Sequence, residues 1–213
     1  MDKEYYHVYN RGVDKRNIFE DKKDALRFLS CMELFNTTQA LGGVYTIGLL
    51  EKRNKRHSMS RIVEFVAYCL NQNHYHFIIS PLVENGVQKF MQRLSNGYTK
   101  YFNEKYRRSG ALFQGRYKRK LIETNEYLLH LSCYVNLNNL VHEGLNEQWL
   151  NEEGFSSFNQ YIGKDGKGIF CSSSVIIDQY NDLDTYNKQA LNRLQSIIQK
   201  KKTDKELAKI LLE

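Results

Sequence analysis

Hydrophobic and polar positions follow two different periods along the chain, and both periods predict regular structure. Five segments are rich in aromatic and β-branched residues, which is typical of strands. Only the polar turn NQN separates the third of these segments from the fourth, which favours a hairpin. The predicted strands are residues 5–11, 42–51, 62–70, 74–80 and 116–124.

Other segments carry apolar residues at spacings of three and four. This spacing predicts amphipathic helices over residues 21–40, 85–107 and 125–144. Asn125 can cap the start of the last helix, and Gly144 can end it. The order of strands and helices favours an α+β fold, a ferredoxin-like sandwich with a central antiparallel sheet and helices on one face.

The last part of the chain is predicted to be a C-terminal helical extension, residues 166–213, of a main domain, residues 1–165. After an irregular segment, residues 183–201 have the apolar spacing of a helix. A capping box at Thr203 and Glu206 predicts that a second short helix begins there. A terminal helical pair is the simpler interpretation, and the start of a helix-turn-helix-like module is the alternative.

The charge of the chain indicates one kind of candidate partner, a polyanion. The chain has 31 basic and 24 acidic residues, a formal net charge of +7, which favours either a polyanion partner or simply a basic surface. The segment KYRRSGALFQGRYKRK, residues 105–120, holds seven of the basic residues, no acidic residue and three aromatic rings. Basic residues interleaved with aromatic residues are typical of nucleic-acid binding. A solvated basic edge is the alternative for this segment, and both interpretations stay open for the loop KRNKRH, residues 52–57.

Cysteine spacing and hydropathy indicate which cellular location to expect for the protein. Cys31, Cys69, Cys133 and Cys171 are too far apart in sequence for a CxxC motif, so we expect reduced thiols, as in a cytoplasmic protein. The charged start MDKEYYHVYN is unlike a signal peptide, and no apolar run approaches the ~20 residues that cross a bilayer. We therefore expect a cytoplasmic location and no membrane role.

The segment HYHFIIS contains the most specific candidate chemistry. Residues two apart on a strand point to the same face, so His74 and His76 present two imidazoles side by side. This spacing suits two ligands of one divalent metal, although half-buried structural histidines are the alternative.

The helix over residues 125–144 carries a polar stripe, His130, Tyr134, Asn138 and His142, at steps of one turn. Alone, this stripe is typical of a solvated face. Opposite the histidine strand, it would offer a tyrosine hydroxyl and an amide oxygen to the same metal. Mg²⁺ or Mn²⁺ tolerates such mixed ligands, Mn²⁺ more readily.

Several blocks of the sequence, in this order, resemble a known family. They are YHVYNRGVDKRNIFEDKKDALRFL, AYCLNQNHYHFIIS, FMQRLSNGYTKYFNEKYRRSGALFQGRYK, YLLHLSCYVNLNNLVHEGL and GFSSFNQYIG. Together they resemble the single-tyrosine HUH transposases of bacterial insertion sequences, and most of all the REP-associated tyrosine transposases. The resemblance covers about residues 5–163.

The resemblance implies a role for each matching residue. It implies that His74 and His76 are metal ligands, that Tyr134 is the nucleophile and that Asn138 is the third ligand. The family commonly has proline after that ligand, where this chain has Asn139. It also implies that the first strand ends beside the DNA. The expected DNA contacts, from resemblance and composition together, are Asn10, Arg11, Lys52, Arg53, Lys55, Arg56, Lys105, Arg107, Arg108, Arg116, Tyr117, Lys118, Arg119 and Lys120.

The implied reaction is metal-assisted cleavage and rejoining of single-stranded DNA beside a hairpin, through a 5′-phosphotyrosine intermediate. His130 is a candidate for proton transfer, with a local structural role as the alternative. A transposase-derived protein that binds the hairpin without cleaving it is the alternative function. Other HUH enzymes and an RNA-binding ferredoxin-like domain fit the blocks less well, and the sequence leaves monomer and homodimer both open.

Overall fold

The computed structural model describes residues 3–39, 60–141, 154–164 and 168–210. The segment 42–51, predicted as a strand, lies outside these residues. So does the basic loop with Lys52, Arg53, Lys55 and Arg56. Gly144 and His142 fall outside them as well.

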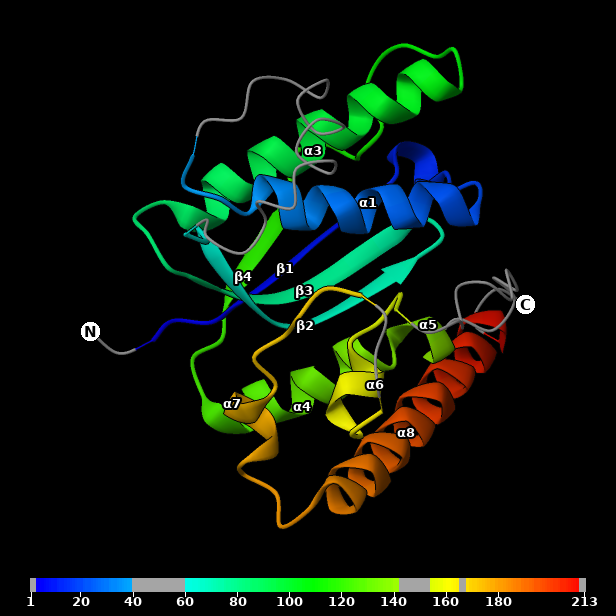
Figure 1. The fold of residues 1–213 in the computed structure, drawn as a ribbon. Coiled ribbons are helices and arrows are strands. Elements are labelled where there is room, and N and C mark those ends of the chain that lie inside the picture. The colour runs from blue at the N-terminus through cyan, green and yellow to red at the C-terminus, as the bar shows by residue number, and fades with distance from the viewer. Residues whose placement is uncertain (1–2, 40–59, 142–153, 165–167, 211–213) are drawn as a thin grey trace.

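A four-stranded antiparallel sheet forms the centre of the molecule (Figure 1). Its strand order is β2-β3-β1-β4, so β3 lies between the strand that precedes it in the hairpin and the first strand of the chain. The short turn between β2 and β3 confirms the predicted hairpin. The strands are β1 (Tyr6–Arg11), β2 (Val63–Asn71), β3 (His74–Pro81) and β4 (Lys118–Leu121).

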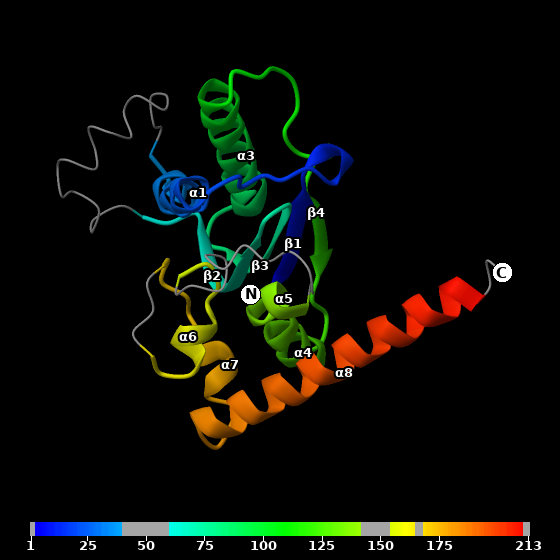
Figure 2. The same ribbon diagram turned by 90° about the vertical axis from the view of Figure 1, so that its right-hand side faces the viewer.

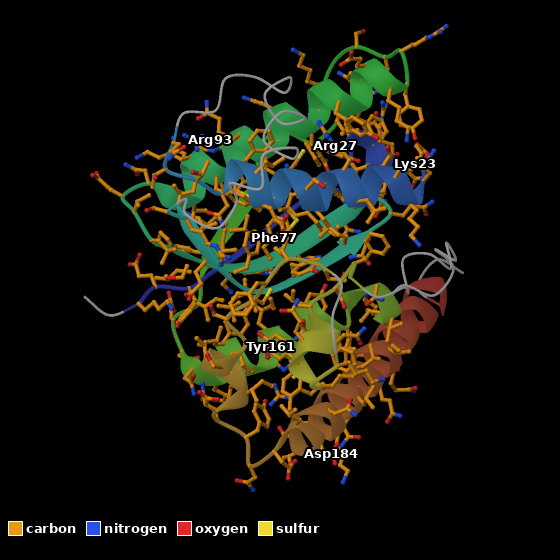
Figure 3. All side chains as sticks on the ribbon, viewed as in Figure 1. Lys23, Arg27, Phe77, Arg93, Tyr161 and Asp184 are labelled. Atoms are coloured by element: carbon orange, nitrogen blue, oxygen red, sulfur yellow. The ribbon has the colours of Figure 1, made fainter. Side chains whose placement is uncertain are left out.

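Two long helices, α1 (Lys22–Phe35) and α3 (Gly86–Lys105), cover one face of this sheet (Figure 2). The described elements thus follow the order β-α-β-β-α-β, which confirms the predicted α+β fold. Phe28 of α1 packs against the rings of Tyr75 and Phe77 on β3, and Phe77 points into this layer (Figure 3). Gly97 lets the two helices approach, because a Cβ at this position would lie 2.4 Å from the Phe35 ring.

The second face of the sheet is covered too, by helices from the later part of the chain. Tyr161, Val135 and Tyr186 are fully buried in a separate apolar cluster against Ala67 and Ile78 of the sheet (Figure 3). The prediction of helices on one face only is therefore wrong, because the C-terminal extension packs on the other face together with α4. The helices here are α4 (Asn125–Asn136), α5 (Asn138–Val141), α6 (Phe158–Tyr161), α7 (Ser174–Ile177) and α8 (Leu183–Ile210).

Three predictions about helix boundaries are wrong. The segment predicted as one helix over residues 125–144 is divided at Leu137, which separates α4 from α5. Thr124, not Asn125, caps α4, since its side chain accepts a hydrogen bond from the backbone N–H of Tyr127. The predicted helical pair at the C-terminus is one continuous helix, and Thr203 donates to the carbonyl of Gln199 within it.

The four cysteines are buried, and none of them forms a disulfide bond. Within the described ranges, no helix combines the length and the apolar character needed to span a bilayer.

A buried carboxylate joins α1 to α3. Asp24 is fully buried, and its oxygens accept hydrogen bonds from Tyr101 at 3.1 Å and Tyr106 at 2.8 Å. Lys105 donates to it at 2.6 Å and also pairs with Asp21. A buried charge is stable only when it is paired and hydrogen-bonded, so these contacts depend on one another.

We expect Asp24→Ala to lower the free energy of unfolding by about 3 to 5 kcal/mol, because Lys105 and two tyrosine hydroxyls lose their shared acceptor. Asp21→Ala is the matched control: this partly exposed carboxylate caps α1, and its loss should cost about 1 kcal/mol. Urea denaturation of both variants measures the difference. Equal losses of unfolding free energy in the two variants would show that the buried Asp24 contributes no more to stability than the exposed Asp21.

Candidate active site

His74 and His76 lie on the same face of β3, the face that meets α4 and α5. Their ring centroids are 5.2 Å apart, and the ring planes are nearly perpendicular. The antiparallel register places Asn71 of β2 and Arg11 of β1 opposite His74. Tyr9 of β1 lies opposite His76. The sheet therefore presents both imidazoles within a polar strip of three neighbouring strands.

Asn138 connects the helical layer to this strip. It is fully buried at the start of α5, and its Oδ1 lies 3.1 Å from Nε2 of His74. The same oxygen accepts a hydrogen bond of 2.9 Å from the side-chain amide of Asn71. The interruption of the helix at Leu137 places Asn138 in a short helix of its own, against the ends of β2 and β3.

Tyr134 lies one turn earlier, on α4. Its half-buried ring packs edge-on to His76, with 5.6 Å between the ring centroids. Burial raises the pKa of the Tyr134 hydroxyl, and a hydrogen bond to Asn138 opposes this shift. The phenol is therefore protonated at neutral pH in this state.

His7 is a further member of this group, although neither the HYH motif nor the polar stripe includes it. Its Nε2 lies 2.9 Å from Nδ1 of His76, and its ring stacks on the His76 ring. Burial, and then the positive charge of Lys120, lower the pKa of His7 to about 4, so this imidazole is neutral at pH 7. The alternation in YYHVYNR, which puts His7 on the face of Tyr9 and Arg11, is the signal that would have found it.

The donor atoms fit a divalent cation. Nδ1 of His74 lies 2.6 Å from Oδ1 of Asn73, which only accepts hydrogen bonds. A neutral imidazole has a single N–H, so Nε2 of His74 keeps a lone pair that faces the Asn138 oxygen. The bond to His7 engages Nδ1 of His76, so Nε2 is the nitrogen through which His76 would hold a metal. In the part of the chain that the structure describes, no three His, Cys, Asp or Glu side chains form a metal-binding group, so a metal here would need the Asn138 amide.

The basic residues of β4 divide between the two faces of the sheet. Lys118 and Lys120 lie opposite Tyr9 and His7, on the face of the two histidines. Arg119 lies on the other face, with its guanidinium 4.8 Å from the centroid of the Tyr6 ring. All residues of β4 are exposed at this edge of the sheet.

The other predicted DNA contacts include residues with structural partners. Lys105 is held by Asp21 and Asp24, and Arg108 donates to Asn103 and to the carbonyl of Ala111. Arg107 is exposed.

Asn10 and Arg11 both reach the loop that precedes β4. Asn10 is buried, and its side-chain amide donates 3.2 Å to the carbonyl of Gly115. Arg11 donates to the side chain of Gln114. The end of β1 thus holds this loop in place.

His130 is exposed on α4. Partial burial and the charge of Arg193 on α8 lower its pKa. The neighbours that shift the pKa of Tyr134 are different ones, with Asn138 first among them. These surroundings favour the local structural role for His130.

A buried hydrogen-bond network fixes α4 two residues after Tyr134. Asn136 is fully buried, and its amide donates 2.8 Å to the hydroxyl of Tyr186 on α8. Its oxygen accepts from Ser157, which also accepts from the backbone N–H of Tyr68 on β2. The helix that carries Tyr134 is therefore tied to the sheet and to the C-terminal helix at one point.

Comparison with known proteins finds a family that is similar to this region. Residues 48–138 match the family model described as "Transposase IS200 like", and this match includes His74, His76, Tyr134 and Asn138. The predicted resemblance to these transposases is confirmed. A search of curated proteins found no match.

Among solved structures, the chain is similar to one described as "Structure of the REP associates tyrosine transposase bound to a REP hairpin". The similarity covers 80% of this chain and 90% of that chain, at 14% sequence identity and a TM-score of 0.48.

The network around Asn136 yields a stability prediction. We expect Tyr186→Phe to lower the free energy of unfolding by about 1 to 3 kcal/mol, because the buried amide of Asn136 loses its acceptor. Tyr180→Phe is the matched control, since its hydroxyl makes no hydrogen bond to Asn136 or Ser157. Thermal or urea unfolding separates the two variants, and a loss as large for Tyr180→Phe would contradict the assignment.

Proposed function

We propose that the protein is a tyrosine transposase that cleaves and rejoins single-stranded DNA at hairpin-flanked sites, with a divalent metal. The observation that carries the proposal is the meeting of Tyr134 with His76, and of Asn138 with His74, in the segment that matches the transposase family. A tyrosine beside a mixed nitrogen and oxygen donor set suits phosphoryl transfer.

In this proposal His74, His76 and Asn138 hold Mg²⁺ or Mn²⁺. The ion would polarise the scissile phosphate and stabilise the charge that develops on it. His7 is a positioning residue, since its hydrogen bond to Nδ1 of His76 fixes the orientation of that ring.

Tyr134 is the nucleophile. Its hydroxyl oxygen attacks the phosphorus of a DNA phosphodiester and loses its proton as the new P–O bond forms. The bond from phosphorus to the 3′ oxygen breaks, and that oxygen takes up a proton to become a free 3′-OH. A 5′-phosphotyrosine remains, which keeps the energy of the broken bond. Attack by a 3′-OH on this link reverses the reaction and rejoins the strand.

The DNA would pass along the exposed edge of β4. Lys118 and Lys120 project from this edge on the face of the site, where they can neutralise phosphates. Since Lys105 is engaged by two carboxylates, we leave it out of the proposed interface.

Tyr134 meets His76, and Asn138 meets His74, within one chain, so the proposed site needs no residue from a second copy. We keep residues 1–165 as the proposed catalytic domain and assign to the extension after it the role of supporting α4, with the cytoplasm as the proposed location. The alternative, a hairpin-binding protein that does not cleave, is an outcome of the first experiment.

We expect wild-type protein with a labelled single-stranded hairpin substrate and Mg²⁺ or Mn²⁺ to give a slower band on a denaturing gel. Tyr134→Phe should reduce this band by about 10³-fold or more, because no nucleophilic oxygen remains. EDTA should abolish it. Tyr127→Phe, seven residues earlier on the same helix, is the control and should leave it unchanged. Tight binding on a native gel without a covalent band under either metal would establish the non-cleaving alternative.

We expect His7→Ala to weaken Mn²⁺ binding by about 10- to 100-fold, because His76 loses the partner that orients its ring. Calorimetric titration with Mn²⁺ measures this without any DNA. His130→Ala is the matched control, a histidine outside the proposed metal site, and should bind as the wild type does. Unchanged affinity in His7→Ala would exclude the positioning role.

A further inference from the structure

The residue before the histidine pair, Asn73, contacts His74 on one side and the chain after β1 on the other. It is the second residue of the two-residue turn between β2 and β3. Its Oδ1 lies 2.6 Å from Nδ1 of His74, and its Nδ2 donates 3.1 Å to the carbonyl of Lys15. One side-chain amide therefore joins a candidate metal ligand to a residue 58 positions earlier in the sequence.

The contact with Lys15 decides which end of the Asn73 amide faces His74. A backbone carbonyl can only accept hydrogen bonds, so the group of Asn73 that meets it is the NH₂. The amide oxygen then faces the imidazole, and this oxygen can also only accept. Asn73 thus presents a hydrogen-bond acceptor to Nδ1 of His74.

Two oxygens compete for the single proton of a neutral His74 ring. The Asn73 oxygen lies 2.6 Å from Nδ1, and the Asn138 oxygen lies 3.1 Å from Nε2. The Asn138 oxygen also accepts a hydrogen bond of 2.9 Å from Asn71. Because hydrogen bonds weaken as they lengthen, the shorter contact favours the proton on Nδ1. Nε2 then keeps its lone pair on the side of Asn138, where the proposed metal would lie.

Without the Asn73 side chain, the same competition would have the opposite result. The Asn138 oxygen would be the acceptor that faces the ring, so the proton would favour Nε2. A proton on Nε2 occupies the position of a metal, and His74 would cease to be a ligand although no heavy atom had moved. The orientation of one amide therefore decides whether His74 can serve the proposed metal centre.

The turn after β1, residues 12–16, supplies the carbonyl that orients Asn73, and its conformation is uncommon. Asp14 and Lys15 have positive φ values of 54° and 60°. Residues other than glycine adopt this conformation at an energy cost, and it persists where surrounding contacts impose it. Two such residues in succession indicate that the position of the Lys15 carbonyl is imposed by its surroundings.

The turn between β2 and β3 provides part of these surroundings. The backbone N–H of Gly12 donates 2.8 Å to the carbonyl of Asn73. The backbone N–H groups of Ile18 and Phe19 donate to the carbonyl of Gln72, at 2.8 and 3.1 Å. The chain after β1 and the hairpin turn are therefore joined by backbone hydrogen bonds on both sides of the contact between the amide and the carbonyl.

A simpler role for Asn73 is to form the hairpin turn, since asparagine and aspartate are common in turns. That role requires no contact with an imidazole. The side chain instead makes one contact as a donor and one as an acceptor, and a reversed amide would place two acceptors against each other at Lys15. This pairing favours a role at His74.

We infer that Asn73 is a positioning residue that holds the proton of His74 on Nδ1, and that the carbonyl of Lys15 fixes Asn73 in the orientation that this requires. His74 thereby keeps Nε2 as its ligand atom. The consequence for a metal rests on the proposed function, whereas the tautomer of His74 can be observed in the protein without any metal.

The tautomer is measured from the ¹⁵N chemical shifts of the imidazole in the metal-free protein, at about pH 8, where an ordinary histidine is neutral. The signals of His74 are those that disappear in His74→Gln. We expect Nδ1–H in the wild type and in Asn73→Asp, because a carboxylate accepts the same hydrogen bond. In Asn73→Ala we expect the proton on Nε2. An Nε2–H tautomer in the wild type, or Nδ1–H in Asn73→Ala, would overturn the inference.

Calorimetric titration with Mn²⁺ measures the consequence for the proposed ligand. We expect Asn73→Ala to weaken Mn²⁺ binding by about 10- to 100-fold, and Asn73→Asp to change it by less than about threefold. Both variants lose the donor to the Lys15 carbonyl, and only Asn73→Asp keeps an acceptor for His74. Equal affinities in the two variants would therefore contradict the positioning role.

Gln72→Ala and Lys15→Ala are the matched controls. Gln72 shares the hairpin turn and contributes its backbone carbonyl, which alanine retains. Lys15→Ala removes an exposed charge and keeps the carbonyl that Asn73 contacts. Both should show the tautomer and the Mn²⁺ affinity of the wild type. A weaker affinity in Lys15→Ala would assign the effect to its charge and not to the carbonyl.

Hydrogen exchange tests the contact between Asn73 and the turn after β1. A carboxylate cannot donate to the Lys15 carbonyl, so the backbone N–H groups of residues 12–16 should exchange faster in Asn73→Asp than in the wild type. The tautomer of His74 should stay the same in this variant. Unchanged exchange would show that the Lys15 carbonyl does not hold Asn73.

The inference and the proposed function fail separately. An Nδ1–H tautomer that depends on Asn73, in a wild-type protein that does not bind Mn²⁺, would remove the proposed metal centre and keep the positioning of His74. A metal-dependent covalent band together with an Nε2–H tautomer in the metal-free wild type would remove the positioning role and keep the chemistry.

Discussion

The candidate site depends on one buried amide. Asn138 has no exposed surface, and its oxygen meets both the amide of Asn71 and the imidazole of His74. A buried polar group of this kind must find partners, so it fixes how α5 sits on the ends of β2 and β3. The position of α4, and of Tyr134 on it, follows from the same contact. At the candidate site, a hydrogen bond of defined geometry positions the helix on the sheet. Apolar packing alone would tolerate small shifts of the helix.

The sequence was sufficient to predict the four described strands and to place His74 and His76 on one face of a strand, because strand alternation and the HYH spacing are local signals. It could not predict the end of the helix at Asn136. Local propensity favours continuation through Leu137, but the partners that stop it, Asn71 and His74, lie more than sixty residues away in sequence. For the C-terminal helix the error was the opposite one. The capping box at Thr203 predicted that a new helix begins there, yet one helix continues through it.

Composition alone gives every basic residue of the segment 105–120 the same expected role, DNA binding. The structure shows that these residues have different surroundings. Lys105 neutralises the buried Asp24, a need that belongs to α1 and cannot be seen in the basic segment itself. Within the part of the chain that the structure describes, Lys118 and Lys120 pair with no buried carboxylate, and both lie on the side of the histidines. His7 was overlooked for a related reason. Its importance comes from the diagonal contact to His76 across two paired strands, and the order of those strands is a property of the whole fold.

Two neighbouring residues at the end of β1 hold the loop that precedes β4. Asn10 and Arg11 are neighbours, so their side chains point to opposite faces of β1, yet both reach this loop, at Gly115 and Gln114. Gly115 has a positive φ of 68°, a conformation that suits glycine and turns the chain into β4. The same few residues therefore set the start of the strand that carries Lys118 and Lys120. A shift of this loop would move this basic edge of the sheet, so the contacts from β1 also position the two lysines relative to the histidines.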